Sequence, residues 1–396
     1  MSVKLLIEES PAETRAALTK NGQVWSFWFS ADAQAGGLYL GKVKSIDRKL
    51  QAAFVDIGFG EAGFLPITNA HKLSEGQPVP VRIKRPATSG KGPLLTTQLG
   101  IEKDSLVAFV ERAGDTPAKL DQIEADAVQA YRHFEKFQPW EVIVSGTSAF
   151  LALQAYMSGE KVEALSELEA HADGGLFELE GVEEAIEQAL SRTVTLPGGG
   201  RLIFDEAEAL TAVDVDVAAT QGQSKRGSII KACLEAIPEL FRQLSLRRIG
   251  GQVVIDFPAL AVKGGGQVRA ALKEAAKTLP GARLIRLDDT GLAIYTVPRR
   301  HLSLLDLLAE YHGPGPIQGR RLSTHALAAE VLRKADEQLR QNPSGRFEIL
   351  ATEEVIDLMA AKPDWQQKLT TQYGARFSLS VSSKREREWS DVREIR

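Results

Sequence analysis

Three aspartates lie near the ends of two apolar runs that have the length of strands. Asp214 and Asp216 belong to Leu-Thr-Ala-Val-Asp-Val-Asp-Val, which starts at Leu210, and Asp256 belongs to Gly-Gly-Gln-Val-Val-Ile-Asp-Phe, which starts at Gly250. Carboxylates that are held together repel one another unless a cation neutralises them. Mg²⁺ takes hard oxygen ligands, often one or two carboxylates with waters and a substrate phosphate. These residues therefore point to a Mg²⁺ site.

The stretch between the two runs has the period of a helix. Apolar residues recur three and four positions apart from Ser228 to Leu246, so the sequence predicts strand, helix and strand. This crossover makes the two strands parallel, and ligands of open parallel sheets bind outside the carboxyl ends of the strands. Asp214 and Asp216 share one strand face while the valines between them face the core. A single aspartate that caps a helix or faces water is the alternative, but two such positions around one crossover favour a metal site.

Short apolar runs separated by glycine, asparagine and aspartate turns fill residues 37–100. This rhythm favours a small barrel of the OB type. Phe54 and Phe64 lie on neighbouring predicted strands, where they would stack on bases, although both could instead be core residues. OB folds bind single-stranded nucleic acid with aromatic platforms and basic grooves. The basic residues available for a phosphate backbone are Lys42, Arg82, Lys84, Arg85 and Lys91.

These strings together resemble the ribonuclease E/G family. The resemblance is carried by Thr195-Leu196-Pro197 with Gly199, Glu206 to Asp216, Arg248 to Gly251 with Val254 to Phe257, Gly63 to Pro66, and Lys91 to Thr97. It implies that Asp214 and Asp256 hold a catalytic Mg²⁺, with Mn²⁺ as an alternative ion. Asp216 stands where the family normally has Asn, and we expect it to orient the attacking water or to support the metal. The resemblance also implies that Phe54, Phe64 and Lys91 contact RNA.

Two features of the resembled family are altered here. Its Arg-Thr pocket for a 5′-monophosphate would have Glu111 and Arg112 at the two positions. We predict a strand over Leu106–Val110, which turns Arg112 to the opposite strand face, so Arg112 is kept only as a candidate RNA contact and the sensor as degenerate. The family's Cys-Pro-x-Cys motif, which shares one zinc between two subunits, has no thiol here, and a lone His312 is not a zinc site. We expect no zinc, and any homodimer would not be linked by it.

Composition narrows the class of protein. The chain has 396 residues and a formal net charge of −4, so several domains are expected and any surface that binds nucleic acid must be locally basic. Its single cysteine, Cys233, excludes an intramolecular disulfide. The N-terminus has no signal-peptide pattern, and no apolar run is long enough to span a membrane. The sequence therefore predicts a cytoplasmic protein without a membrane partner.

The expected fold is a multidomain α/β (α+β) architecture: ribonuclease-H-like and DNase-like α/β subdomains with an inserted OB-fold β-barrel and a small C-terminal α/β domain. The expected parts are the N-terminal piece of the ribonuclease-H-like subdomain (1–36), the barrel (37–100), a degenerate 5′-sensor-like region (101–145), the rest of the ribonuclease-H-like subdomain (146–202), the catalytic metal-binding subdomain (203–302), a linker (303–320), and the C-terminal domain with a charged tail (321–396).

The function expected from these observations is Mg²⁺-dependent endoribonucleolytic cleavage of single-stranded RNA in RNA processing or decay. Attack by water would leave a 5′-phosphate and a 3′-hydroxyl. Two other classes stay open: a non-catalytic RNA-binding or ribosome-associated relative, and a metal-dependent nuclease that acts on DNA. The altered sensor, the missing thiols and Asp216 favour divergence, whereas Asp214 and Asp256 argue against complete loss of catalysis.

Overall fold

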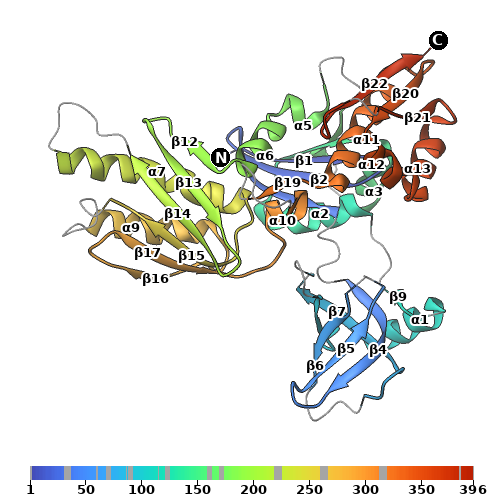
Figure 1. The fold of residues 1–396 in the computed structure, drawn as a ribbon, viewed down its shortest axis with the longest axis horizontal. Coiled ribbons are helices and arrows are strands. Elements are labelled where there is room, and N and C mark those ends of the chain that lie inside the picture. The colour runs from blue at the N-terminus through green and yellow to red at the C-terminus, as the bar shows by residue number, and fades with distance from the viewer. Residues whose placement is uncertain are drawn as a thin grey trace.

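The fold is that of a computed structural model of the whole chain. The residues that it describes are 2–30, 37–58, 61–67, 73–85, 87, 92–114, 116–120, 125–157, 163–168, 174–217, 225–258, 266–311, 319–382 and 385–395. Figure 1 shows a central lobe with the C-terminal domain on one side, a lobe that contains β13–β17 on the other, and the barrel set apart from both. No helix in the described part of the chain is long and apolar enough to cross a membrane.

The central lobe is a mixed sheet of order β11-β10-β1-β2-β3, in which β1, β2 and β3 are antiparallel and β10 runs parallel to β1. Alternate residues of β1 face opposite sides, as a strand requires. Leu5 and Ile7 pack with α2 and α3, and Leu6 packs with α5 and α6. The elements are β1 (Val3–Glu9), β2 (Thr14–Lys20), β3 (Gln23–Phe29), α2 (Asp126–Phe134), η2 (Glu135–Phe137), β10 (Glu141–Ser145), α3 (Thr147–Tyr156), β11 (Leu165–Glu167), α5 (Leu176–Leu179) and α6 (Val182–Leu190). The N-terminal strands thus join a segment that is more than a hundred residues away in the chain.

The barrel predicted between β3 and α2 is confirmed. Its strands follow the order β5-β6-β8-β7-β4, and a further β4–β5 pairing closes the ring. Closure brings β4 so near β5 that a Cβ on Gly41 would lie 2.4 Å from Val55 Cγ1 and 2.9 Å from Asp56 O, so only glycine fits there. The strands are β4 (Leu38–Asp47), β5 (Ala52–Asp56), β6 (Gly63–Pro66), β7 (Pro78–Arg85) and β8 (Leu94–Thr96).

Two short elements follow the barrel: α1 (Lys103–Ala113) and β9 (Ala118–Lys119). The strand predicted over Leu106–Val110 is wrong, because these residues belong to α1. Leu106, Phe109 and Val110 are three and four positions apart, which places them on one helix face, and they pack beneath β4. Arg112 is also helical, so the argument from opposite strand faces does not apply to it.

The lobe of β13–β17 holds the predicted crossover. Its sheet has the order β12-β13-β14-β15-β17-β16, and β14 and β15 are parallel while their other neighbours are antiparallel. α7 and α9 cover one face, where their apolar side chains form a core with the buried residues of the strands. Cys233 lies fully buried in this core. The elements are β12 (Thr193–Thr195), β13 (Gly200–Glu206), β14 (Leu210–Val217), α7 (Lys225–Leu246), β15 (Gly251–Asp256), α9 (Gly266–Ala275), η3 (Ala276–Thr278), β16 (Arg283–Leu287) and β17 (Leu292–Val297).

The C-terminal part is an α/β domain whose sheet has the order β21-β20-β22. Two expectations need correction here. The stretch expected as a linker carries α10 and β18, which pairs with β19, while residues 312–318 with His312 lie outside the described part. The charged tail contains β22, which pairs with β20, so several of its charged residues belong to a strand. The elements are α10 (Leu304–Leu308), β18 (Ala309–Tyr311), β19 (Arg320–Leu322), α11 (Thr324–Gln341), β20 (Arg346–Ala351), α12 (Glu353–Ala360), α13 (Pro363–Tyr373), β21 (Phe377–Val381) and β22 (Ser390–Ile395).

A buried arginine and a nearby carboxyl group lie where the lobe of β13–β17 meets the central lobe. Arg247, at the end of α7, is fully buried, lies over the Phe204 ring at 4.0 Å, and donates to the Ser191 carbonyl at 2.7 Å. The Oε1 atom of Glu206 is also closed off from solvent. Burial raises the pKa of Glu206 to about 7, although the nearby Arg247 charge opposes this shift.

Glu206 should make the stability of the fold depend on pH. Because its carboxyl has an ordinary pKa of 4.5 when unfolded and a pKa of about 7 when folded, the folded chain binds more protons between these values. The free energy of unfolding should therefore fall as pH rises through this window, by at most about 3 kcal/mol. Urea unfolding between pH 5 and 8 should show a shallower fall for Glu206→Gln. The exposed Glu208→Gln should keep the wild-type slope, and equal slopes for all three proteins would contradict this account.

Candidate metal centre and nucleic-acid interface

Asp214 and Asp256 are direct neighbours across two parallel strands. β14 and β15 pair in a register that sets Asp214 opposite Asp256, and the backbones of paired strands lie about 4.8 Å apart. Both aspartates are exposed, whereas Val213 and Ile255, one position earlier, are buried against the helices. The two residues are therefore strand neighbours, as predicted, on the sheet face opposite α7 and α9.

This pair has the chemistry of a site for a hard divalent cation. Two like charges on adjacent strands repel each other, and an ion between them would convert repulsion into attraction. Among the described residues, no group of three or more His, Cys, Asp or Glu side chains is placed to hold a metal ion. Such a triad is not needed for Mg²⁺, which keeps several waters and is often bound by one or two carboxylates with substrate phosphate. The donor set therefore fits Mg²⁺ better than an ion that needs a closed protein cage.

Asp216 lies on the same face but has a different partner. Arg201 on β13 stands directly opposite Asp216 in the antiparallel register, and its Nε donates to Asp216 Oδ2 at 3.1 Å. The side chains are 56% and 51% exposed. Sequence reasoning missed Arg201. Arg201 takes an outward position on β13 beside the buried Leu202, and its pairing with Asp216 follows only from the register of the hairpin.

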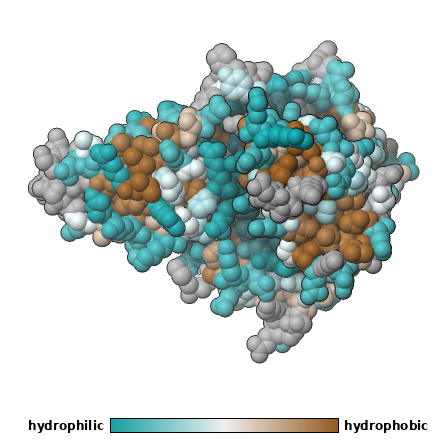
Figure 2. Space-filling view, turned by 90° about the horizontal axis from the view of Figure 1, so that it is seen from below, coloured by the Kyte–Doolittle hydropathy of each residue, from teal (hydrophilic) through white to brown (hydrophobic). Residues whose placement is uncertain are grey.

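The sheet face around these carboxylates is only partly covered. Val254, Leu292 and Ile294 are half-buried there, so apolar side chains lie on the same face as the aspartates. Seen from below, the lobe at the left of Figure 2 presents hydrophobic residues edged by hydrophilic ones. An apolar surround lowers the local dielectric, which strengthens the interactions of the charges beside it.

The predicted RNA contacts of the barrel fall into two groups. Phe54 and Phe64 stand opposite each other on β5 and β6, with ring centroids 5.9 Å apart at 75°, and both are half-buried. Lys42 is exposed on the adjacent β4, level with Asp56. These rings and this charge come together on the outer face of the barrel, as a platform for stacked bases requires.

Of the remaining predicted contacts Arg82, Lys91 and Arg112, only Arg82 has a side chain that the structure describes. Arg82 donates from Nε to the Leu99 carbonyl at 2.7 Å, which ties the chain after β8 to the barrel. Lys91 lies outside the described residues, and for Arg112 only the helical backbone of α1 is described. The structure therefore brings together Phe54, Phe64 and Lys42, and it gives Arg82 a contact with the chain after β8.

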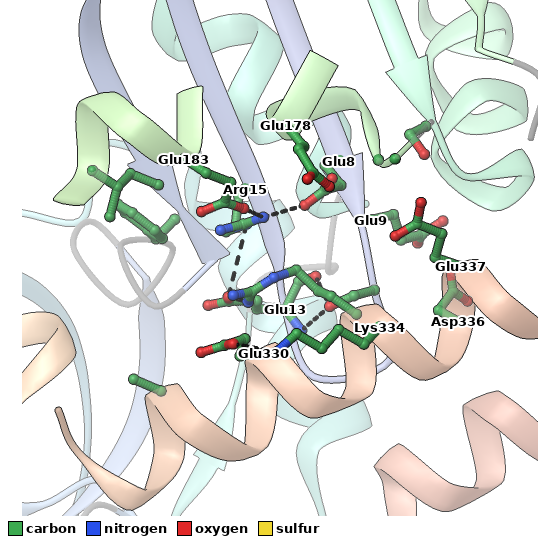
Figure 3. Close-up of a pocket in the computed structure, with 18 of the residues that line it drawn as sticks. Glu8, Glu9, Glu13, Arg15, Glu178, Glu183, Glu330, Lys334, Asp336 and Glu337 are labelled. Atoms are coloured by element: carbon green, nitrogen blue, oxygen red, sulfur yellow. Dashed lines mark hydrogen bonds and ion pairs between the residues drawn. The ribbon is translucent and has the colours of Figure 1, made fainter. Parts of the chain in front are cut away.

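A cavity of about 310 Å³ lies between the central lobe and α11, away from every predicted site residue. Figure 3 shows acidic side chains around it, with Arg15 between Glu8 and Glu183. Among its described lining residues, nine are acidic and four are basic, so its charge disfavours RNA. The ion pair of Arg333 with Glu13, at 2.6 Å, links the C-terminal domain to the β1–β2 turn. We interpret the cavity as a polar junction between domains.

Comparison with known proteins agrees with the site geometry. The model of the ribonuclease E/G family matches residues 102–280, the stretch that contains Arg201 and all three aspartates. This match and the relatives named ribonuclease G and ribonuclease E support membership of the ribonuclease E/G family.

Three curated relatives show how far the similarity to this family extends. Ribonuclease G of Escherichia coli (strain K12) is 26% identical over 349 residues, which cover 65% of this chain and 71% of that protein. Ribonuclease G of Haemophilus influenzae is 23% identical over 429 residues, covering 84% and 87% of the two chains. Ribonuclease E of Escherichia coli (strain K12) is 28% identical over 357 residues, covering 67% of this chain but 34% of that protein. The similarity to ribonuclease G of Haemophilus influenzae therefore spans most of both chains.

The repulsion between Asp214 and Asp256 should be measurable as stability. Asp214→Asn removes one of two adjacent like charges, so in EDTA it should raise the free energy of unfolding by up to about 1 kcal/mol. Added Mg²⁺ should stabilise the wild type but not the variant, because a ligand stabilises only the state that binds it. Thermal unfolding with and without Mg²⁺ tests both effects. Asp205→Asn is the matched control, since Asp205 pairs with Arg192 at 2.6 Å. An Asp214→Asn protein less stable than wild type in EDTA would contradict the repulsion.

Proposed function

We propose that this protein is a Mg²⁺-dependent endoribonuclease that cleaves single-stranded RNA in RNA processing or decay. The observation that carries the proposal is the register pair of Asp214 and Asp256 on an exposed sheet face, in a chain of the ribonuclease E/G family. The relatives named ribonuclease G and ribonuclease E support RNA as the substrate class. The products would carry a 5′-phosphate and a 3′-hydroxyl.

Asp214 and Asp256 would hold Mg²⁺, with Mn²⁺ as an alternative ion. A bound divalent ion lowers the pKa of its water and stabilises the charge of a phosphodiester under attack. The two aspartates fix the position of the reaction on the rigid β14–β15 pair, where a backbone register and a buried core on the other face hold them. Sites on rigid elements keep their groups in register better than sites on loops.

The barrel would supply the affinity for a single strand. Phe54 and Phe64 offer stacking surfaces that tolerate any base, and Lys42 offers charge for the backbone. Lys91, Arg82 and Arg112 remain proposed contacts with RNA on the strength of the sequence. Glu111, which stands where the resembled family has Arg, is an exposed carboxylate on α1. Because a carboxylate repels phosphate, we propose that binding does not depend on the phosphorylation state of the RNA 5′ end.

Cleavage should require both aspartates and a divalent ion. A labelled A/U-rich RNA incubated with Mg²⁺ should be cut internally, and Asp214→Asn or Asp256→Asn should slow cutting by about 10²-fold or more, because each removes charge that the reaction needs. EDTA should abolish it. The cut fragments are resolved on a gel, and a DNA strand of the same sequence is tested in parallel. The variant Glu208→Gln, at an exposed carboxylate, is the control and should cut like the wild type.

The outcomes of this assay separate the remaining classes. Equal cutting of DNA would favour a general metal-dependent nuclease. Tight RNA binding without any cutting would favour a non-catalytic RNA-binding relative.

Binding should depend on the two barrel phenylalanines. Each stacked base contributes about 1–3 kcal/mol, so Phe54→Ala should weaken binding of a fluorescent single-stranded RNA in EDTA by about 5- to 150-fold. Fluorescence anisotropy measures this directly without cleavage. Tyr311→Ala, at a ring that is 79% exposed on β18, should leave the affinity unchanged. Unaltered binding by both Phe54→Ala and Phe64→Ala would remove the barrel platform from the proposal.

A further inference from the structure

The third carboxylate of the exposed face is matched by a basic residue on the next strand. β13 and β14 are antiparallel, and their register sets Arg201 directly opposite Asp216, with Nε and Oδ2 3.1 Å apart. The pairing of β14 with β15 reaches Asp214 and Asp256 and does not extend to Asp216. The strand neighbour of Asp216 is therefore Arg201, and the contact draws its carboxylate toward β13.

This direction separates Asp216 from the other two aspartates. Asp214 has Asp256 on one side and the apolar Ile203 on the other. Asp216 is held on the side away from β15, which agrees with the finding that no group of three described carboxylates is placed to hold a metal. As a pair, Arg201 and Asp216 carry no net charge.

We propose that Arg201 is a positioning residue for the metal site: it keeps Asp216 out of the ligand set and cancels its charge, so that the ion meets two carboxylates and not three. This inference rests on the proposed function, because it takes Asp214 and Asp256 as the ligands. The Arg201–Asp216 pair sets the affinity of the site for the ion, and through it the ion concentration that the enzyme needs.

Metal affinity should follow the charge of this pair. Arg201→Gln leaves the charge of Asp216 uncompensated, so a divalent ion should bind about three- to tenfold more tightly. This factor is the attraction expected from one additional negative charge that lies a few ångströms beyond the two ligand carboxylates in a solvated site. Asp216→Asn leaves Arg201 uncompensated and should weaken binding by a similar factor. The double variant Arg201→Gln/Asp216→Asn should return to within about twofold of wild type, and Arg201→Lys should stay close to wild type because the charge is kept.

The experiment is a titration of the full chain with Mn²⁺, read by the electron paramagnetic resonance signal of the free ion, without RNA and without cleavage. Arg192→Gln is the matched control, because Arg192 forms a half-exposed ion pair with Asp205 on the same sheet. Its Mn²⁺ affinity should be unchanged. Asp214→Asn identifies the site, since it should abolish the tight binding, and circular dichroism verifies that every variant is folded.

Two results would overturn the inference in different ways. If Mn²⁺ binding depends on Asp214 but Arg201→Gln and Asp216→Asn both behave like Arg192→Gln, the pair has no role at the metal and the proposed function still stands. If Mn²⁺ binding does not depend on Asp214, or no binding occurs, then the metal site of the proposed function fails together with the role of Arg201.

Discussion

Two carboxylates side by side on parallel strands are an electrostatic cost that the rest of this lobe must offset. The register of β14 and β15 fixes Asp214 beside Asp256, and the two backbone positions cannot separate without breaking the sheet. The offset comes from the other face, where Val213, Ile255 and their neighbours bury apolar surface against α7 and α9. Burial of each large apolar side chain contributes about 1.5–3 kcal/mol, well above the repulsion of one solvated charge pair. The core thus holds in place an arrangement that is unfavourable by itself and that a bound cation would stabilise.

The same alternation of residues explains why this site could be predicted from the sequence. Valine and aspartate alternate in β14, so the face of each residue followed from the period of a strand, and the helical spacing of α7 implied that β14 and β15 are parallel. Arg201 escaped prediction because its partner lies fifteen residues away across a hairpin, and the register of a hairpin depends on its turn. The family resemblance pointed to Asn at position 216 but could not show what compensates an Asp there.

The elements that the sequence prediction assigned wrongly or missed also have local physical explanations. Leu106–Val110 is rich in valine and phenylalanine, which favour strands, yet the apolar edge of the barrel below β4 offers a surface that suits a helix with Leu106, Phe109 and Val110 on one side. Tertiary packing therefore decided the conformation against the local preference. β22 was missed because its alternating charges, such as Arg393 and Glu394, look like a solvated tail, whereas a strand at the edge of a sheet tolerates charge on its exposed side.

The placement of the barrel within the chain has a consequence for synthesis on the ribosome. All strands of the barrel are contiguous in sequence, whereas β1 must wait for β10, more than a hundred residues later, before the central sheet can close. Domains fold as units while the chain emerges from its N-terminus, and distant pairings form late because their loops are costly to close. The barrel therefore completes its fold while β1 still lacks its partner strand β10. The strand β15, which carries Asp256, emerges only after the barrel and β10. The nascent chain gains the proposed surface for nucleic acid well before it gains the second of the carboxylates that are proposed to act on it.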